Sequence, residues 1–198
     1  MTDEQRLTRR RLLELGLAVP PLVLAGHAGE AWAAGDRLRA TPSCDDETPE
    51  QTEGPFYTPQ TPRRRSIVPA GAPGTRLTVT GRVLTTNCRP IPRALLDFWQ
   101  ANARGVYDNE GFQFRGHQRA DAKGRYRLET VLPGLYTGRT RHIHVKVQAP
   151  GAPVLTTQLY FPGVARNQTD GIFDPSLLVK LSRKTRPWTA RFDFVFDI

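Results

Sequence analysis

Two histidines and a tyrosine close together in the sequence have the residue types of a metal site. His142 and His144 are two of only 4 histidines among 198 residues, and Tyr136 precedes them by a few positions. From residue 141 onward, apolar and polar residues alternate, which predicts a half-buried strand over residues 141–148. Residues two apart on a strand share a face, so both imidazoles should point the same way. Because His is the commonest metal ligand in proteins, the pair indicates a metal site.

A simpler interpretation is that the two histidines are polar residues on a solvated strand face. Their surroundings favour a site, because Tyr136, Arg139 and a Pro133-Gly134 turn lie within nine positions of His142. A phenol and a guanidinium so close to an imidazole pair indicate a site and not a solvated strand face.

The remainder of the chain limits the kind of metal site. Residues 145–150 hold no carboxylate and no histidine follows them, which argues against a cupin pattern. An iron(II) site with two histidines and one carboxylate would need Asp108 or Asp121, and a zinc site with three histidines would need His117. Tyrosines are better candidates, because a phenolate is a hard anionic donor that trivalent iron stabilises.

A series of motifs, in one order along the chain, resembles the intradiol ring-cleavage dioxygenases. This is a family of non-haem iron(III) enzymes that includes the protocatechuate and catechol dioxygenases. The motifs are Thr52-Glu-Gly-Pro-Phe-Tyr57, Asp97-Phe-Trp-Gln-Ala-Asn102, Gly105-Val-Tyr107, Asp121-Ala-Lys-Gly-Arg-Tyr126, Pro133-Gly-Leu-Tyr136, Arg139, His142-Ile-His144 and Leu155-Thr-Thr-Gln-Leu-Tyr-Phe161. No single motif is decisive, but the ordered set is specific.

The resemblance implies a ligand set and a reaction. Carried over residue by residue, the Fe(3+) ligands would be Tyr107, Tyr136, His142 and His144. The implied reaction uses dioxygen to open the ring of a catechol-type substrate between its two hydroxylated carbons, and gives a cis,cis-muconate-type product. Tyr136 would be the ligand that the substrate displaces, which gives it a catalytic role as well.

The resemblance also assigns residues around the metal. Arg139 would stabilise negative charge on the substrate, a role that suits a fixed guanidinium. Gln158 corresponds to a pocket glutamine of the family, and Pro55 and Tyr57 would line the substrate pocket. By residue type alone, Arg139 would be a surface arginine and Gly-Pro a simple turn. Trp99 is predicted to lie in the core.

This chain differs from the better-known members of the family at one loop. Five residues separate Tyr136 from His142, where those members carry a longer loop, so a more open substrate pocket is expected. No counterpart of the helical N-terminal extension of the catechol 1,2-dioxygenases is expected. The size of the chain is nearer to that of protocatechuate-type subunits, which makes a homo-oligomer an expectation.

Short strands must position these residues. β-Branched and aromatic residues between turn signals predict strands at residues 76–84, 94–100, 124–129, 141–148, 154–161 and 190–196. Their spacing, without helical periodicity, favours an all-β sandwich over residues 76–198; the resemblance makes it the intradiol dioxygenase (prealbumin-like) type. The last strand should turn its aromatic face inward, and residues 176–180 should form a short helix or turn. Residues 34–75, rich in Pro, Thr and Gly, predict an extended N-terminal arm.

The N-terminus predicts an export signal over residues 1–33. Thr8-Arg-Arg-Arg-Leu-Leu13 resembles a twin-arginine motif, an apolar run follows over residues 15–28, and Ala31-Trp-Ala33 has the form of a cleavage site. The run is too short and broken for a membrane span; a frayed amphipathic helix is the alternative. The expected partner during export is the twin-arginine translocase, and the expected location is periplasmic or secreted.

Cysteine and charge content support modest inferences. An even cysteine count in an exported protein predicts a disulfide between Cys44 and Cys88, worth about 4 kcal/mol on the chain-entropy model. The net charge of +9 is unchanged without residues 1–33. No nucleic-acid-binding motif accompanies the arginines, so no nucleic-acid partner is expected, and the charge favours anionic small molecules or an anionic surface.

A rival interpretation is a non-catalytic binding or surface module. Its basis is a second resemblance, to prealbumin-like sandwiches, carried by residues 79–83, 124–126 and 132–136. Such modules need neither the histidine pair nor Tyr107 and Gln158. A zinc or copper enzyme that uses His117 is a third interpretation, and the identity of the metal separates all three.

Overall fold

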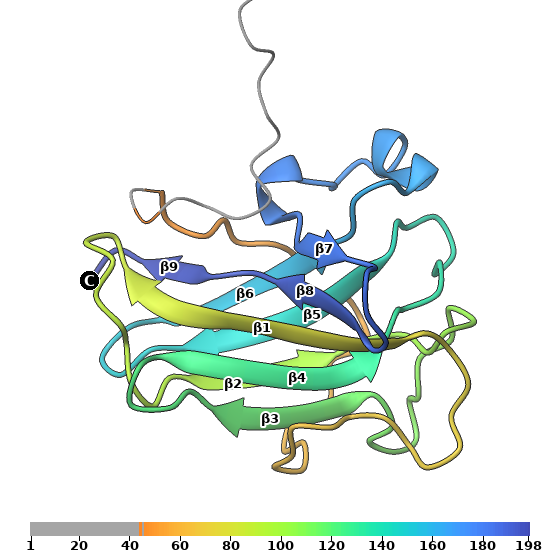
Figure 1. Cartoon of the computed structure of the whole chain (residues 1–198), viewed down its shortest axis with the longest axis horizontal. Helices are drawn as coiled ribbons and strands as arrows, with labels where there is room; N and C mark the ends of the chain where they lie inside the picture. Colours follow the sequence, from red (N-terminus) through yellow and green to blue (C-terminus); the bar gives the residue numbers. More distant parts are fainter. Residues whose placement is uncertain (1–43, 45) are drawn as a thin grey trace, which may run out of the picture. The chain divides into compact units, whose positions relative to one another are not determined.

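The computed structural model describes residues 44 and 46–198, so the predicted export signal lies outside the described residues. Within this part the chain forms strands and two short 3-10 helices (Figure 1). No helix found there combines the length and apolar character needed to cross a membrane. The elements are β1 (Arg76–Thr85), β2 (Leu95–Trp99), β3 (Arg115–Arg119), β4 (Arg125–Val131), β5 (His142–Gln148), β6 (Val154–Tyr160), η1 (Ala165–Gln168), η2 (Pro175–Leu177), β7 (Lys180–Ser182), β8 (Trp188–Arg191) and β9 (Phe194–Phe196).

The strands form two sheets that pack face to face. One sheet has the order β4-β1-β8-β7, with β9 also paired to β1, and the other has the order β3-β2-β5-β6. β1 is the centre of the first sheet, antiparallel to β4 and parallel to both β8 and β9. This arrangement confirms the predicted all-β sandwich.

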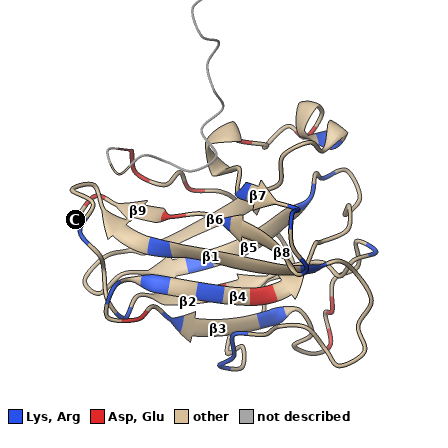
Figure 2. Ribbon diagram, in the orientation of Figure 1, with Lys and Arg blue, Asp and Glu red and all other residues tan. Residues whose placement is uncertain are grey.

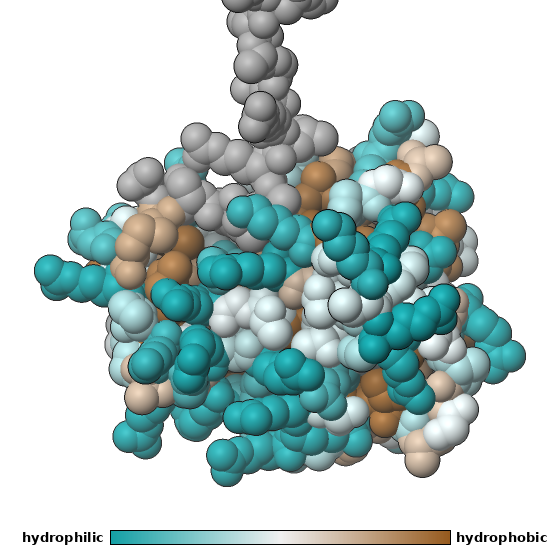
Figure 3. All heavy atoms as spheres, viewed as in Figure 1, coloured by the Kyte–Doolittle hydropathy of each residue, from teal (hydrophilic) through white to brown (hydrophobic). Residues whose placement is uncertain are grey.

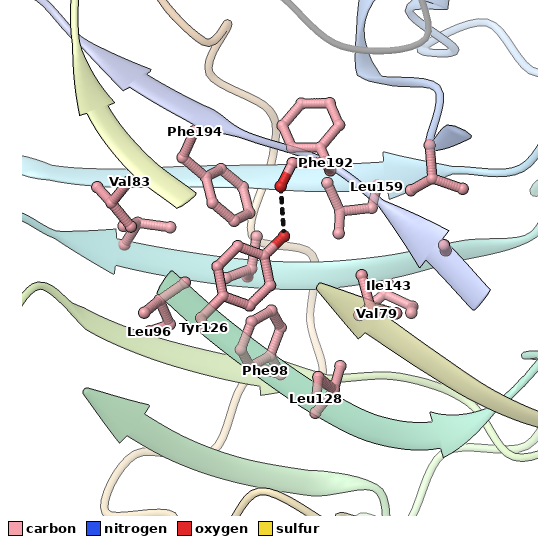
Figure 4. Packing of buried hydrophobic residues seen from close by; sticks show 14 of the residues in the cluster. Val79, Val83, Leu96, Phe98, Tyr126, Leu128, Ile143, Leu159, Phe192 and Phe194 are labelled. Atoms are coloured by element: carbon pink, nitrogen blue, oxygen red, sulfur yellow. Dashed lines mark hydrogen bonds between the residues drawn. The ribbon is translucent and has the colours of Figure 1, made fainter. Parts of the chain in front are cut away.

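The core lies between the inner faces of the two sheets. Val79 and Leu128 come from the first sheet, Phe98 and Ile143 from the second, and all four are fully buried (Figure 4). Tyr126 also points into this core, and its hydroxyl donates a hydrogen bond of 2.8 Å to the carbonyl of Phe192. The inward residues recur at every second position, which is the period of a strand with one buried face.

The predicted strands match the observed ones, with two exceptions. The predicted closing strand at residues 190–196 is divided into β8 and β9, because the chain departs from the ladder at Phe192 and Asp193. There the Asp193 carboxylate accepts a hydrogen bond of 2.8 Å from the backbone N–H of Arg82. The aromatic face is buried as expected.

The second exception is that the sequence gives no signal for β3 and β7, which are short and carry few apolar residues. The predicted turn at residues 176–180 overlaps η2.

The described part of the arm, residues 46–75, contains no strand or helix, as expected, but it is bound to both sheets. Backbone N–H groups of Thr48 and Gln51 donate to carbonyls of Val195 and Thr156, at 3.0 and 2.8 Å. The predicted disulfide is confirmed, because the sulfur atoms of Cys44 and Cys88 are 2.07 Å apart. The arm is therefore bound to the sandwich by backbone hydrogen bonds and a covalent link.

Candidate metal centre

The two histidines project from the outer face of β5. Ile143 and Val145 face the core, and this alternation turns His142 and His144 to the other side, as the sequence predicts. The Nδ1 atom of His142 lies 2.6 Å from the carbonyl oxygen of Thr140. A carbonyl only accepts hydrogen bonds, so Nδ1 carries the proton and Nε2 presents a lone pair.

His144 is held by a different contact. Its ring stacks on the indole of Trp99 in the neighbouring strand β2, with centroids 4.8 Å apart and planes 7° apart. Among the described residues, no group hydrogen-bonds its buried Nδ1 atom. The backbone of Gly54 packs against the same imidazole, since a Cβ atom at this glycine would lie 3.5 Å from Cε1. Trp99 is buried, but it lies in a separate cluster with Tyr107 and not in the main core, so the prediction of a core residue is wrong in its location. It supports the site instead.

Three donor atoms converge beside β5. The Tyr107 hydroxyl lies 3.0 Å from Nε2 of His142, which lies 3.1 Å from Nε2 of His144. Tyr107 follows β2 on a loop and is buried. Three predicted ligands, from two segments far apart in sequence, are therefore brought together.

Tyr136, the fourth predicted ligand, borders this group. Its ring contacts that of Tyr107 edge-on, with centroids 5.5 Å apart, and also lies edge-on to Phe56 at 5.3 Å. Tyr136 is only half-buried, whereas the other three are buried. It is therefore the solvent-facing member of the set.

Burial dominates the electrostatics of the site. It lowers the pKa of His142 to about 4 and the pKa of His144 well below its ordinary value. It also raises the pKa of the Tyr107 phenol, against the opposing effect of the Arg139 and Arg115 guanidinium groups. At neutral pH both imidazoles are thus neutral and keep lone pairs, and Tyr107 keeps its proton unless a cation is bound.

The donor set fits a ferric ion. The single lone pair on His142 Nε2 faces both the Tyr107 hydroxyl and Nε2 of His144. A cation bound between these three atoms would accept a lone pair from each of them. A trivalent cation would also favour the phenolate form of Tyr107. Within the described part of the chain, no group of three or more His, Cys, Asp or Glu side chains could hold a metal; any metal bound there needs other donors, such as these tyrosines.

The alternative ligands considered above are engaged elsewhere. The Asp108 carboxylate accepts backbone N–H groups of its own loop, including that of Gly111 at 2.9 Å. Asp121 forms a salt bridge of 2.7 Å with Arg125, and Nδ1 of His117 lies 2.7 Å from the carbonyl oxygen of Thr61. The carboxylate and three-histidine alternatives therefore receive no support from the geometry.

Arg139 is held at the site by three side chains. Its Nε atom donates to the buried carboxylate of Asp170 at 2.9 Å, and Nη2 donates to Gln158 Oε1 at 2.7 Å and to the Tyr160 hydroxyl at 3.3 Å. Burial opposes ionisation of Asp170, but hydrogen bonds from Thr140 and Arg139 hold its pKa below its usual value. Gln158 is fully buried and pairs directly with His144 across β5 and β6. The sequence did not predict a role for Asp170, because it lies 31 residues from Arg139 along the chain.

Pro55 and Tyr57, which were predicted to line the substrate pocket, differ in their surroundings. Pro55 is exposed beside the segment that packs on His144. The Tyr57 hydroxyl donates to the Asp97 carboxylate at 3.2 Å, and its ring packs on Trp99 at 4.8 Å. Between them lies Phe56, not nominated from the sequence, whose ring stacks on Tyr107 with centroids 4.5 Å apart.

A buried arginine that the sequence did not predict as a site residue joins the segments that carry these rings. Arg115 is 1% exposed, and its Nε and Nη2 atoms donate to the carbonyl of Asp108 at 3.0 and 2.7 Å. Its Nη1 atom donates to the carbonyl of Phe56. One guanidinium thus connects the arm with the loop of Tyr107.

Comparisons with known proteins identify the family of this chain. A family model described as Dioxygenase matches residues 52–196. The β chain of protocatechuate 3,4-dioxygenase from Burkholderia cepacia is 36% identical over 160 residues, 68% of each chain. Catechol 1,2-dioxygenase 2 from Acinetobacter lwoffii is 30% identical over 154 residues, and the match spans 65% of this chain but only 56% of that protein.

Two solved structures support the same assignment. The dioxygenase domain of a dioxygenase carbohydrate-binding protein fusion from Streptomyces sp. SirexAA-E is 55% identical, with a TM-score of 0.75 over 77% of this chain and 99% of that domain. The 3-chlorocatechol 1,2-dioxygenase from Rhodococcus opacus 1CP, at 27% identity, has a TM-score of 0.70. The chain belongs to the intradiol ring-cleavage dioxygenase family.

Proposed function

We propose that this protein opens the ring of a catechol-type substrate between its two hydroxylated carbons, with Fe(3+) held by Tyr107, Tyr136, His142 and His144. The observation that carries the proposal is the convergence of the Tyr107 hydroxyl with the Nε2 atoms of both histidines, within 3.0 and 3.1 Å. A non-catalytic sandwich would have no use for these buried, mutually facing polar atoms.

Iron(III), when bound, supplies the Lewis acidity and redox capacity that allow dioxygen to react with the aromatic ring. The protein provides the binding geometry. Both oxygen atoms of O2 enter the product, so catechol and O2 together balance a cis,cis-muconate-type diacid without a separate reductant. Tyr136 is half-buried, which suits a ligand that gives way when the substrate enters.

Arg139 provides fixed positive charge beside the site. Its contacts with Asp170 and Gln158 hold the guanidinium in one orientation, and a preorganised cation stabilises charge that develops on a bound anion without reorganising. We assign it the stabilisation of the ionised catechol oxygens. Gln158 positions Arg139, since its Oε1 accepts from the guanidinium.

Substrate breadth follows from the short loop between Tyr136 and His142. Thr137 and Gly138 are exposed, and a Cβ atom placed on this glycine would meet nothing within 4 Å. We therefore propose an open pocket that accepts catechols with substituents on the ring.

The direct test of the activity measures O2 consumption and muconate formation from catechol by the iron-loaded protein. One O2 should be consumed for each muconate formed, and Tyr107→Phe should lose more than about a hundred-fold in rate, since even outer partners of metal ligands contribute ten- to hundred-fold. Tyr126→Phe is the matched control: it removes a hydroxyl in the core and should retain the activity. A protein that retains iron but forms no muconate would contradict the proposal.

We also propose export of the protein by the twin-arginine translocase. The proposal rests on the motif at residues 8–13, and the Cys44–Cys88 disulfide suits an oxidising compartment. The combined variant Arg9→Lys with Arg10→Lys should accumulate uncleaved inside the cell. Export of that variant at the wild-type level would disprove this route.

A further inference from the structure

The outer side of the β4-β1-β8-β7 sheet carries much of the positive charge of the chain. Two adjoining hollows, of about 880 and 470 Å³, are open on this side and share Arg127 in their linings. Eight arginines and two carboxylates, Glu129 and Asp121, line them. We call these arginines the arginine face: Arg65, Arg76, Arg82, Arg119, Arg125, Arg127, Arg186 and Arg191.

Strand alternation builds this array. Tyr126 and Leu128 on β4 point into the core, which turns Arg125 and Arg127 outward. Across the sheet, Arg125 pairs with Arg82, while Arg127 and Arg191 pair with Thr80 from opposite sides. Neighbouring strands are about 4.8 Å apart, so cations recur at intervals of about 5 to 10 Å in two dimensions. Figure 2 shows the basic segments along β1 and β4.

Local carboxylates neutralise only part of this charge. Arg125, Arg127 and Arg191 form exposed salt bridges with Asp121, Glu129 and Asp193.

Three other arginines of the face behave differently. Arg65, Arg82 and Arg186 are exposed and make no salt bridge with any carboxylate of the described part of the chain. Guanidinium groups bind carboxylates and phosphates through two parallel hydrogen bonds. The face therefore offers planar, anion-directed donors to a partner.

The other lining residues indicate the class of partner. Hydroxyls of Ser66, Thr75 and Thr80 line the hollows, whereas the one aromatic lining residue, Tyr126, is buried and its hydroxyl is bound to Phe192. Small apolar groups, including Val68 and Pro187, also line the larger hollow, but none of the large exposed apolar side chains among the described residues does. The face thus lacks the stacking aromatics that hold single-stranded nucleic acid and the large apolar anchors that enter membranes. Figure 3 shows this side as mainly hydrophilic.

We propose that the arginine face binds an acidic polysaccharide. Its carboxylates would pair with the guanidinium groups, and its sugar hydroxyls would meet Ser66, Thr75 and Thr80. The histidine pair faces outward from the other sheet, so a polymer bound here leaves the metal centre open to substrate. The face would hold the enzyme on an anionic polymer while small aromatic molecules reach the opposite side.

Binding of the full-length protein to immobilised polygalacturonate tests this inference. Wild-type protein should bind at low ionic strength and be released as salt shortens the Debye length. The triple variant Arg65→Gln, Arg82→Gln, Arg186→Gln should bind roughly a hundred-fold more weakly, at about five-fold for each arginine near an anionic surface. The matched control changes three exposed arginines outside the face, Arg89→Gln, Arg93→Gln and Arg166→Gln, and should bind like the wild type.

Each outcome decides the inference. Catechol turnover and the melting temperature should be the same in the face variant and the wild type, which shows that folding and the metal centre are intact. If both triple variants bound polygalacturonate equally weakly, net charge alone would explain the binding, and the proposal would be overturned. Absence of polygalacturonate binding, or tighter binding of the wild type to duplex DNA or to phosphatidylserine vesicles, would overturn it as well.

Discussion

The two site histidines are held by different kinds of contact. The Nδ1 atom of His142 donates to the Thr140 carbonyl at 2.6 Å, which fixes both its tautomer and its ring orientation. His144 has no such bond among the described residues and is fixed by the stack on Trp99, with planes 7° apart. The orientation of one of the proposed ligands, His144, therefore depends on an aromatic contact.

Trp99→Leu tests that dependence. Removing the stack should weaken iron binding by about ten-fold, since an aromatic pair contributes about 0.5–1.5 kcal/mol beyond its buried area; Trp99→Phe should restore part of it. Competition with a chelator measures the affinity. Phe98→Leu is the control, because Phe98 is also buried on β2 but faces the core. Equal loss of iron in both leucine variants would assign Trp99 to general stability.

Protonation of His142 should make the stability of the metal-free protein depend on pH. Its folded pKa of about 4 lies below the unfolded value of about 6.5, so between these values the unfolded state binds the proton and stability falls as pH falls. From pH 7 to 5 the loss should be about 2 kcal/mol. Denaturant titration of the wild type and His142→Gln measures it, and an identical pH slope in both would contradict this account.

At the scale of elements, the site lies where the arm, the loop after β2 and strand β5 meet. Arg115, the first residue of β3, donates to the carbonyls of Phe56 in the arm and Asp108 in the loop. A buried guanidinium that satisfies backbone carbonyls fixes both segments at once. The ring of Phe56 is thereby kept against Tyr107.

Arg115→Met should release this connection. We expect a loss of about 2–4 kcal/mol in the free energy of unfolding, because buried carbonyls lose charged donors, together with faster loss of iron to a chelator. Thermal unfolding and chelator competition report the two effects. Arg119→Met, at the exposed end of β3, should cost under about 0.5 kcal/mol. If Arg115→Met retained wild-type stability and iron affinity, the proposed link would be wrong.

Element-scale features also show how far the sequence predicts the structure. The period of two in residues 141–148 was sufficient to place both imidazoles on one face, and motif order was sufficient to select Tyr107. Asp170, Phe56 and Arg115 were missed because their roles depend on contacts with residues far away in the sequence. The division between β8 and β9 was missed for the same reason, since it involves a hydrogen bond from the backbone N–H of Arg82 to the Asp193 carboxylate.

At the scale of the molecule, the two proposed sites lie on opposite sides of the sandwich. The proposed metal donors lie on the outer face of the β3-β2-β5-β6 sheet, and the arginine face lies outside the other sheet. The arm is joined to the domain by the disulfide between Cys44 and Cys88, which closes a sequence separation of 44 residues.

Removal of this disulfide should lower the stability of the whole domain. Closing a loop of this length reduces the entropy of the unfolded chain by an amount worth about 4 kcal/mol. Cys44→Ser with Cys88→Ser should therefore lower the melting temperature by roughly 8–16 °C. Calorimetry without reductant measures the difference, and an unchanged melting temperature would show that the link contributes nothing to stability.

The most direct test of the central claim is the visible spectrum of the iron-loaded protein, recorded before and after anaerobic addition of catechol. Ferric iron bound by Tyr107 and Tyr136 predicts a burgundy tyrosinate-to-iron band that shifts when catechol binds and fades when oxygen is admitted and muconate forms. Tyr107→Phe should change that band, while Tyr126→Phe should leave it unaltered. A colourless protein that retains no iron, or that binds zinc through His142 and His144 instead, would contradict the ferric site and support the non-catalytic module.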